Sequence, residues 1–320
     1  MKLIKRSLVA LLILVVLLIA AAVAVPIIYK KDIVGLIKSD INTFVNAEVD
    51  FDEDISIKIL PSFPNLTVEI ENVHIVGKES FKNDTLVNCS KLVATIGLKE
   101  LFKNQKINLI YLELQKPNIN LISNASGYNW DIVIPSESDS SDVALSADFN
   151  KIIIHEGGLS YTDTSASTFV AFKGISGSFK GKYANDTFDL ISLFDCADAF
   201  ISYDNIPYLY HLPIKTEAVT SINLLTDEYH FKENQFWAGS IEIVADGGMK
   251  YIGDSLDIDI AYASNKATFQ DLLTLVPAYY KEDLADMTAT GEAQVSGTVK
   301  GILSETEIPG YSFKMNLDKG

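Results

Sequence analysis

The 320-residue chain has few of the residues from which catalytic and metal sites are usually built. It contains two cysteines, Cys89 and Cys196, and four dispersed histidines, none of which has a partner at metal-ligand spacing. Two cysteines make no disulfide framework in a chain of this size, so the thiols either pair with each other or stay buried and free. A glycine-rich phosphate loop, a His-Glu-x-x-His pair and a Gly-x-Ser-x-Gly elbow are all missing. We therefore expect no enzyme: no catalytic residues, no metal site and no cofactor.

Positive charge is also scarce, and it is unevenly distributed. The chain has 26 Lys and Arg against 42 Asp and Glu. Residues 1–116 carry 14 basic and 13 acidic side chains, whereas residues 117–320 carry 12 and 29. The second segment would repel a polyanion, so nucleic acid is not expected as a partner. Docking of this segment on an anionic lipid surface is disfavoured for the same reason.

One long hydrophobic run lies at the N-terminus. Three basic residues precede the uncharged residues 8–29, and Lys30 and Lys31 follow them. These 22 residues would make a helix of about 33 Å, which matches a hydrocarbon core of about 30 Å. A cleaved signal peptide is the alternative, but its apolar region is usually only about 7–15 residues long. We predict that residues 1–30 form a cytoplasmic end and a single transmembrane anchor, with the bulk of the chain outside the cytoplasm.

Beyond the anchor, the spacing of apolar residues changes from that of a helix to that of strands. Residues 31–47 show a helical period and predict an amphipathic helix. From Val49 onward the period is two, and a one-residue slip between Ile70 and Val73 indicates a bulge. We assign residues 31–133 to this helix and a first β unit. Residues 134–149, with five serines and four acidic residues, are a linker.

Residues 150–320 form a second β region with glycine-punctuated strands. Within it we predict a helix over residues 268–286, because Thr268 and Asp271 have the spacing of a capping box. The last residues alternate as a strand, with Phe313 and Leu317 on one face. A chain that ended there would leave an apolar strand at a sheet edge, so we expect the protein to continue beyond Gly320.

The stretch PNINLISNASGYNWD, residues 117–131, separates the first unit from the linker. Pro117 predicts the first residue of a strand or a sheet edge, because proline cannot donate to a ladder. Gly127 permits a turn, and Trp130 is expected to cover the end of the sheet.

The order of these features resembles the N-terminal part of AsmA family proteins of the type found in Bacteroidota. The resemblance rests on the short N-terminal end with its single anchor, the helix 32–46, and the phrases Phe63–Val68, Ile107–Leu114, Pro117-x-Ile119-x-Leu121 and Gly127-x-Asn129-Trp130. The later phrases Ile153–Asp163 and Ala267–Pro277 are also similar to others in the family. The resemblance covers nearly the whole chain.

The resemblance implies a mainly β fold with a few helices, in which a transmembrane helix is followed by an elongated, curved, antiparallel β-sheet groove related to that of chorein-type bridge proteins. It also implies that the anchor lies in a bacterial inner membrane and the bulk of the chain in the periplasm. The implied role is in outer-membrane biogenesis, through phospholipid transport or lipid handling between the two membranes. Phospholipid acyl chains would then contact an apolar sheet face, for which the candidates are Leu66, Val68, Ile70, Ile110, Leu112, Leu114, Ile119 and Leu121.

Two alternatives stay open. The eight residues could pack on one another in an ordinary closed core, since an apolar sheet face can be covered by protein as well as by lipid. The chain could also be a non-catalytic assembly factor or scaffold that binds other envelope proteins through strand edges.

Overall fold

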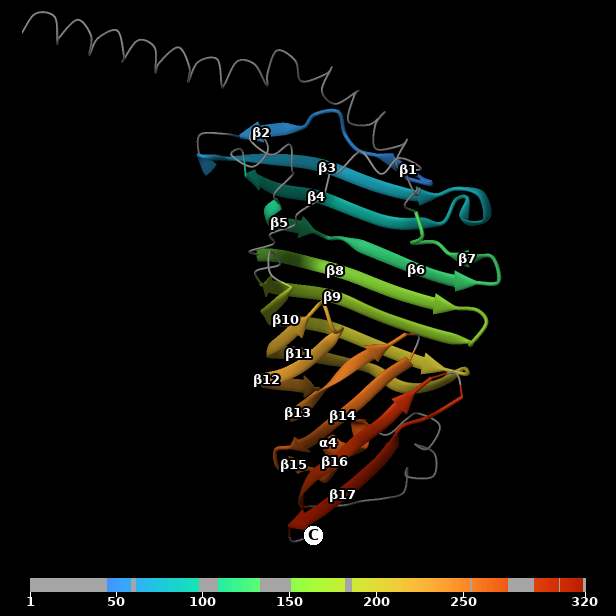
Figure 1. Ribbon diagram of the computed structural model, residues 1–320, viewed down its shortest axis with the longest axis vertical. Coiled ribbons are helices and arrows are strands. Elements are labelled where there is room, and N and C mark those ends of the chain that lie inside the picture. The colour runs from blue at the N-terminus through green and yellow to red at the C-terminus, as the bar shows by residue number, and fades with distance from the viewer. Residues whose placement is uncertain are drawn as a thin grey trace, which may run out of the picture.

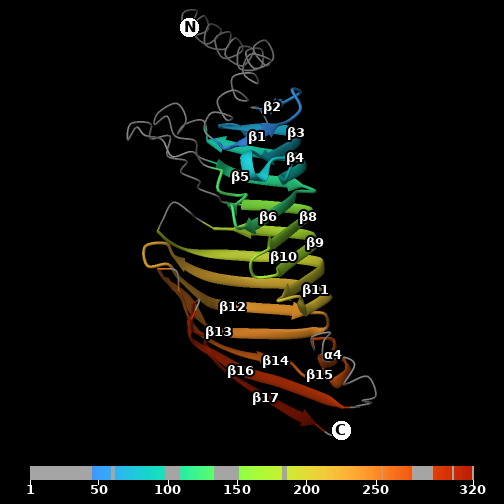
Figure 2. The ribbon, with the colours of Figure 1, turned by 90° about the vertical axis from the view of Figure 1, so that its right-hand side faces the viewer.

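A computed structural model describes most of the chain as one long, curved β-sheet (Figure 1). The described residues are 45–58, 62–97, 109–132, 151–181, 186–253, 255–275, 291–304 and 306–318. Viewed from the side, successive strands follow one another along the length of the molecule from β1 and β2 to β17 (Figure 2).

Within the described residues the sheet contains 17 strands. In its first part these are β1 (Ala47–Asp50), β2 (Ser56–Lys58), β3 (Asn65–Gly77), β4 (Thr85–Gly97), β5 (Leu109–Gln115), β6 (Asn118–Asn124), β7 (Gly127–Tyr128), β8 (Lys151–Asp163) and β9 (Thr168–Lys180). The remaining strands are β10 (Thr187–Tyr203), β11 (Ile206–Asn223), β12 (Glu228–Ala238), β13 (Ile241–Ile252), β14 (Ser255–Ser264), β15 (Ala267–Thr268), β16 (Glu292–Leu303) and β17 (Gly310–Asp318). A 3-10 helix, η2 (Glu79–Phe81), and an α-helix, α4 (Phe269–Thr274), complete the described elements.

Most neighbours in the sheet are consecutive in sequence. β1 and β2 both pair with the outer edge of β3, and β3 pairs with β4. β5 and β6 together form one interrupted row between β4 and β8. From β8 to β14 each strand pairs with the next, and β16 then joins β14 to β17.

The expectation of a purely antiparallel sheet is wrong, because β5 and β6 both run parallel to β8. A parallel pair requires a connection of about a dozen residues or more. Residues 133–150, which contain the predicted linker, provide that length between the first strands and β8. The linker composition was visible in the sequence, but composition does not fix the direction in which the chain returns. Both predicted β regions consequently belong to one mixed sheet.

A line of irregular residues crosses the sheet from β3 to β10. On each of these strand rows, two residues that face the same side are three positions apart instead of two. These pairs are Ile70 and Val73, Leu92 and Cys89, Leu114 and Pro117, Ile154 and Gly157, Ile175 and Phe172, and Cys196 and Ala199. Positive φ angles at Asn72 (51°), Lys116 (49°), Glu156 (50°) and Gly174 (67°) mark this step line. The one-residue slip seen between Ile70 and Val73 is therefore one member of a series. It is not the predicted bulge, because β3 and β4 stay in register across it.

Several predicted elements fall partly or wholly outside the described residues. The predicted anchor, residues 8–29, lies outside them, and no helix in the described part of the chain is long and apolar enough to cross a membrane. The amphipathic helix predicted to residue 47 ended too late, because β1 already begins at Ala47. The capping box at Thr268 is confirmed, and α4 follows it to Thr274. The rest of the helix predicted to residue 286 lies almost entirely beyond the described residues.

Candidate functional site: an apolar sheet face

The sheet has one face that is apolar over almost its whole length. Cross-strand partners project from the same side of a sheet, so their pairing shows which residues share a face. One row of consecutive partners from β3 to β14 is Ile70, Leu92, Leu114, Ile154, Gly177, Phe194, Thr216, Phe236, Ile243 and Ser264. We call this side the apolar face. By the same registers it carries seven of the eight predicted groove residues. The exception is Ile110, which lies at a register shift in β5 where Leu109 is the partner of Ile96. All eight are half-buried.

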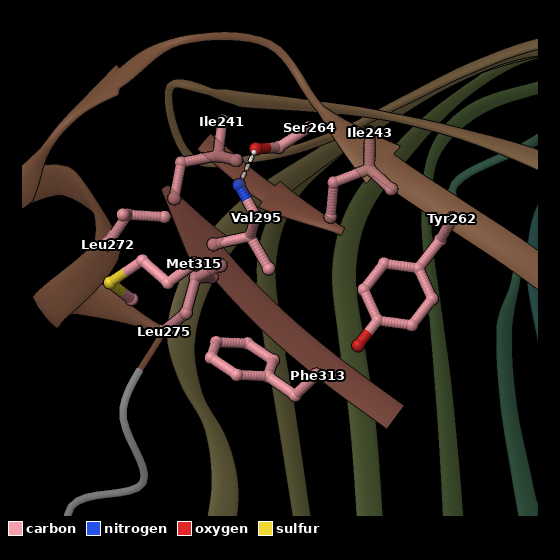
Figure 3. Close-up of a pocket in the computed structure, with 9 residues that line it drawn as sticks. All are labelled: Ile241, Ile243, Tyr262, Ser264, Leu272, Leu275, Val295, Phe313 and Met315. Atoms are coloured by element: carbon pink, nitrogen blue, oxygen red, sulfur yellow. Dashed lines mark hydrogen bonds between the residues drawn. The ribbon is translucent and has the colours of Figure 1, made fainter. Parts of the chain in front are cut away.

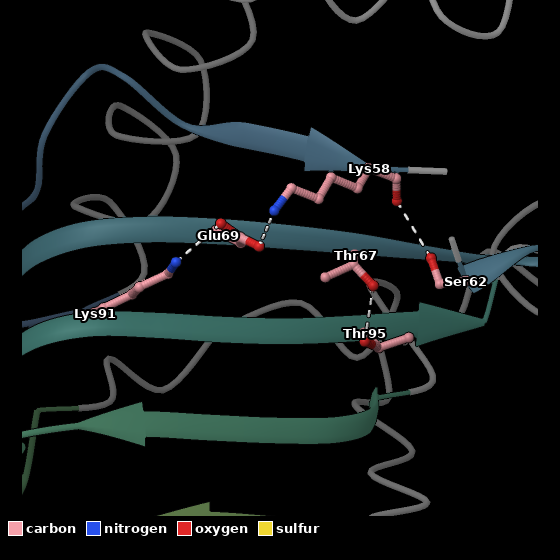
Figure 4. A network of polar contacts seen from close by, with 6 residues as sticks. All are labelled: Lys58, Ser62, Thr67, Glu69, Lys91 and Thr95. Carbon is pink, nitrogen blue, oxygen red and sulfur yellow. Dashed lines mark hydrogen bonds and ion pairs between the residues drawn. The ribbon is translucent and has the colours of Figure 1, made fainter. Parts of the chain in front are cut away.

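The opposite side, the polar face, carries most of the charged residues. The row next to the one above reads Glu69, Val93, Glu113, Ile153, Ser178, Leu193, Glu217 and Gln235. Near β3, Glu69 lies between Lys58 and Lys91, and its Oε2 is 3.0 Å from Lys91 Nζ (Figure 4). Hydrogen bonds from these two lysines lower the pKa of Glu69. This difference between the faces favours water on one side and apolar material on the other.

At the N-terminal end the chain covers part of its own apolar face. Phe51 and Ile55, between β1 and β2, are 5% and 3% exposed and pack on Val73 and Cys89. Val68, Ile70 and Leu114, three of the eight predicted groove residues, pack against this cluster. The closed-core alternative thus applies to part of the first unit.

At the C-terminal end the apolar face instead contains a hollow of about 270 Å³ (Figure 3). We call it the α4 hollow. It is lined by Ile241, Ile243, Tyr262, Ser264, Leu272, Leu275, Val295, Phe313 and Met315, which come from β13, β14, α4 and its C-terminal cap, β16 and β17. Among the described residues of this lining, the only polar side chains are those of Tyr262 and Ser264. The Ser264 hydroxyl is occupied, because it accepts a hydrogen bond of 2.8 Å from the Val295 amide and itself donates to the Asn265 carbonyl oxygen. Such a lining fits a hydrocarbon chain better than a polar ligand.

The helix α4 forms one side of this hollow, and its position follows from its first residues. The Thr268 hydroxyl accepts a hydrogen bond from the Asp271 amide at 3.1 Å, and the Asp271 carboxylate accepts one from the Thr268 hydroxyl. The hydrogen bonds that the Asp271 carboxylate accepts, first of all the one from the Thr268 hydroxyl, hold the pKa of Asp271 below its usual value. The helix then directs Leu272, which is 8% exposed, onto Ile241 and Ala293.

A glycine makes room for the aromatic rings of the hollow. Gly297 lies on the apolar face between Tyr262 and Phe313, its partners on β14 and β17. A Cβ atom there would lie 2.1 Å from the Ser312 carbonyl oxygen and 2.5 Å from the Tyr262 hydroxyl. The sequence showed this glycine only as one of those that punctuate the strands of the second β region. The structure gives it a steric reason.

Pro117, Gly127 and Trp130 lie together at the end of the first unit. Pro117 is buried and directly precedes β6, but β6 is an interior row between β4 and β8, so the edge alternative for this strand does not apply. Gly127 has a φ of 118°, which glycine adopts readily. The Trp130 ring lies 4.9 Å from that of Tyr128 and 6.0 Å from that of Tyr161, and the residue remains 37% exposed.

The deeply buried residue in this turn is Asn129, at 2% exposure. Its side-chain oxygen accepts a hydrogen bond from the Ile122 amide, and its side-chain nitrogen donates to the Asn120 carbonyl oxygen, both at 2.8 Å. Sequence reasoning named Asn129 only as part of the phrase Gly127-x-Asn129-Trp130 and gave it no structural role, because an isolated polar residue next to a tryptophan has no period to identify it.

Most of the α4 hollow was also missed. Its signal was present, since Ile241, Ile243 and Val295 alternate with polar residues in the same way as the first-unit candidates. What the sequence did not show is that these strands continue the same face.

The two cysteines are free and buried, so they do not pair. Both lie on the step line, and each thiol donates to the carbonyl oxygen two residues later and to one on a neighbouring strand. Burial raises the pKa of both thiols. Within the described residues no group of three or more His, Cys, Asp or Glu side chains could hold a metal ion. The expectation of no catalysis and no cofactor stays a prediction.

Residues 1–175 match the sequence model of the AsmA family. The chain belongs to the AsmA family. No curated protein and no solved structure matches it. The region that matches this AsmA model contains all eight groove candidates and ends within β9. The sheet and its apolar face continue without interruption past that point, so the α4 hollow lies outside the matched region.

Proposed function

We propose that this AsmA family protein is a membrane-anchored periplasmic protein of outer-membrane biogenesis, which carries or holds phospholipid between the inner and outer membranes. The observation that carries the proposal is the apolar face, which continues from β3 to β17 while the opposite face is polar. Acyl chains would lie on this face, and headgroups would remain in water at its margin.

The apolar face is not equally accessible to acyl chains along its length. Near β3 and β4, Phe51 and Ile55 already occupy the apolar face, so acyl chains would have least access there. The α4 hollow offers apolar walls and free volume at the other end. We therefore expect the second half of the sheet to hold lipid more strongly than the first.

Photo-crosslinking with neighbouring residues on opposite faces tests the proposal. In β14, Ile258 faces the apolar side and Asp257 the polar side, since their partners in β13 are Met249 and Lys250. A photoreactive amino acid at Ile258 of the full chain, in cells with radiolabelled phospholipid, should give a lipid adduct. The same amino acid at Asp257 should give none. Equal labelling at both positions, or none at Ile258, would refute lipid binding on this face.

A scaffold that binds proteins through strand edges is the second candidate. It is favoured by β17, which among the described strands pairs only with β16 and leaves Tyr311 and Leu317 83% and 64% exposed. Protein adducts at Tyr311, without lipid adducts at Ile258, would support this candidate over lipid transport.

A further inference from the structure

A second hollow lies on the polar face, away from the proposed lipid surface. It has a volume of about 420 Å³ and is lined by Ile191, Leu193, Glu217, Ala218, Val219, Glu233, Asn234, Gln235 and Val244, from β10 to β13. We call it the β12 hollow. Ile191, Leu193 and Val244 are 40%, 42% and 44% exposed, although they lie on the side of the sheet that carries most of the charge. Exposed apolar side chains with a polar rim mark interaction surfaces.

An irregularity in β12 shapes this hollow. The register between β12 and β13 breaks between Phe231 and Phe236. Inside the break, the Asn234 side chain replaces the missing ladder bonds, because it donates to the Ala245 carbonyl oxygen and accepts from the Ala245 amide, both at 2.7 Å. The backbone groups of Ala245 at the break therefore have hydrogen-bond partners. Bulges of this kind often lie beside functional sites.

The charge around the hollow indicates what could bind there. Residues 186–253 contain eleven acidic and only three basic side chains, a net charge of −8. Each of the three lysines is already neutralised by an acidic neighbour: Lys215 by Glu217, Lys232 by Asp189 and Lys250 by Glu228. Two carboxylates line the hollow itself: Glu217, which is the partner of Lys215, and Glu233. An anionic lipid surface or a nucleic acid would be repelled by this field.

We propose that the β12 hollow is a docking site for a basic segment of a partner protein, which places an aliphatic side chain among Ile191, Leu193 and Val244 and sets flanking Lys or Arg residues against the acidic rim. Apolar anchors within a charged rim combine affinity with orientation. This site would recruit a protein on one face of the sheet while the other face remains available to lipid. The proposal does not depend on lipid binding.

The test is photo-crosslinking of the full chain in the cells that naturally produce it. A photoreactive amino acid at Leu193 should yield a discrete protein adduct, and mass spectrometry should place the crosslink in a segment where Lys or Arg flanks an aliphatic residue. The control position is His230, which lies on β12 and pairs with Ser221 and Gly248 outside the hollow. No adduct with the same partner is expected there.

A charge-reversal pair tests the electrostatic part. Glu233→Lys should lower the adduct yield at Leu193 at least fivefold. Asp257→Lys changes the net charge equally on the exposed polar face of β14 and should leave the yield unchanged. Unaltered thermal denaturation would show that both variants fold. The proposal is overturned if Leu193 gives only lipid adducts, no protein adduct above the His230 level, or a partner segment without basic residues. It is also overturned if the two lysine variants behave alike.

Discussion

At the scale of single residues, the turn that ends the first unit depends on a buried amide more than on a large ring. Asn129→Ala would leave the Ile122 amide and the Asn120 carbonyl without their partner, and should lower the free energy of unfolding by about 2–4 kcal/mol. Trp130→Ala removes two partly exposed ring contacts and should cost only about 1–2 kcal/mol. Urea denaturation followed by circular dichroism measures both. A larger loss for Trp130→Ala would contradict this ranking.

A second residue-scale prediction concerns Tyr111 on the polar face. Burial, together with a hydrogen bond of 2.7 Å to Glu113, raises the pKa of Tyr111 to about 12. The folded state therefore keeps this proton at a pH where the unfolded chain, with a tyrosine pKa of about 10, has released it. The resulting stability is present below pH 10 and is lost as the pH rises towards 12. Tyr111→Phe should flatten this alkaline decline, measured as the difference in unfolding free energy between pH 9 and 11.5. The same slope in both proteins would exclude Tyr111 as its cause.

Among the structural elements, the segment between β1 and β2 controls access to the first part of the apolar face. Phe51→Ala should remove the cover over Cys89 and make its thiol react with a maleimide at least tenfold faster, because reactivity of a buried thiol is limited by access. Cys196 is equally buried on β10, so it provides the internal control and should not change. Equal acceleration at both cysteines would indicate general unfolding instead of local uncovering.

The helix α4 should control the α4 hollow in a comparable way. Thr268→Ala removes the N-cap and should destabilise the helix by about 1 kcal/mol. Hydrogen exchange in residues 269–275 should then accelerate about fivefold, while exchange in β10 stays the same. Thr268→Ser keeps the hydroxyl and is the matched control. If serine and alanine gave the same exchange, the cap would not be what holds Leu272 in place.

The elements also show which parts of the fold could be read from the sequence. Alternation identified the strands and the apolar face of the first unit, since a strand places every second residue on one side. The capping box was readable because it depends on two residues three positions apart. The direction of β8 relative to β5 and β6 could not be predicted, because the composition of the connecting residues 133–150 does not determine it. The cover formed by Phe51 and Ile55 joins residues that are distant in sequence, and no local pattern encodes that contact.

At the scale of the whole molecule, the lipid proposal requires a defined orientation in the membrane. We predict that residues 8–29 form an uncleaved anchor with the N-terminus in the cytoplasm. Alkaline phosphatase, which is active only outside the cytoplasm, should be active when fused after Gly320, and β-galactosidase should not. A mature protein that begins near Val25 would instead indicate a cleaved signal peptide, and an active β-galactosidase fusion would reverse the topology.

The step line has a consequence for how such a gene can change in length. Each strand row from β3 to β10 has one additional residue where the step line crosses it. The alternation of apolar and polar residues therefore stays in register between neighbouring strands. Deleting the single codon for Asn72 would shorten β3 alone, and residues 73–77 would then stand one position out of step with β4. A one-residue deletion at the step line in one strand keeps the sheet in register only if the neighbouring strands lose one residue there too. The lengths of these strands are therefore expected to change only together.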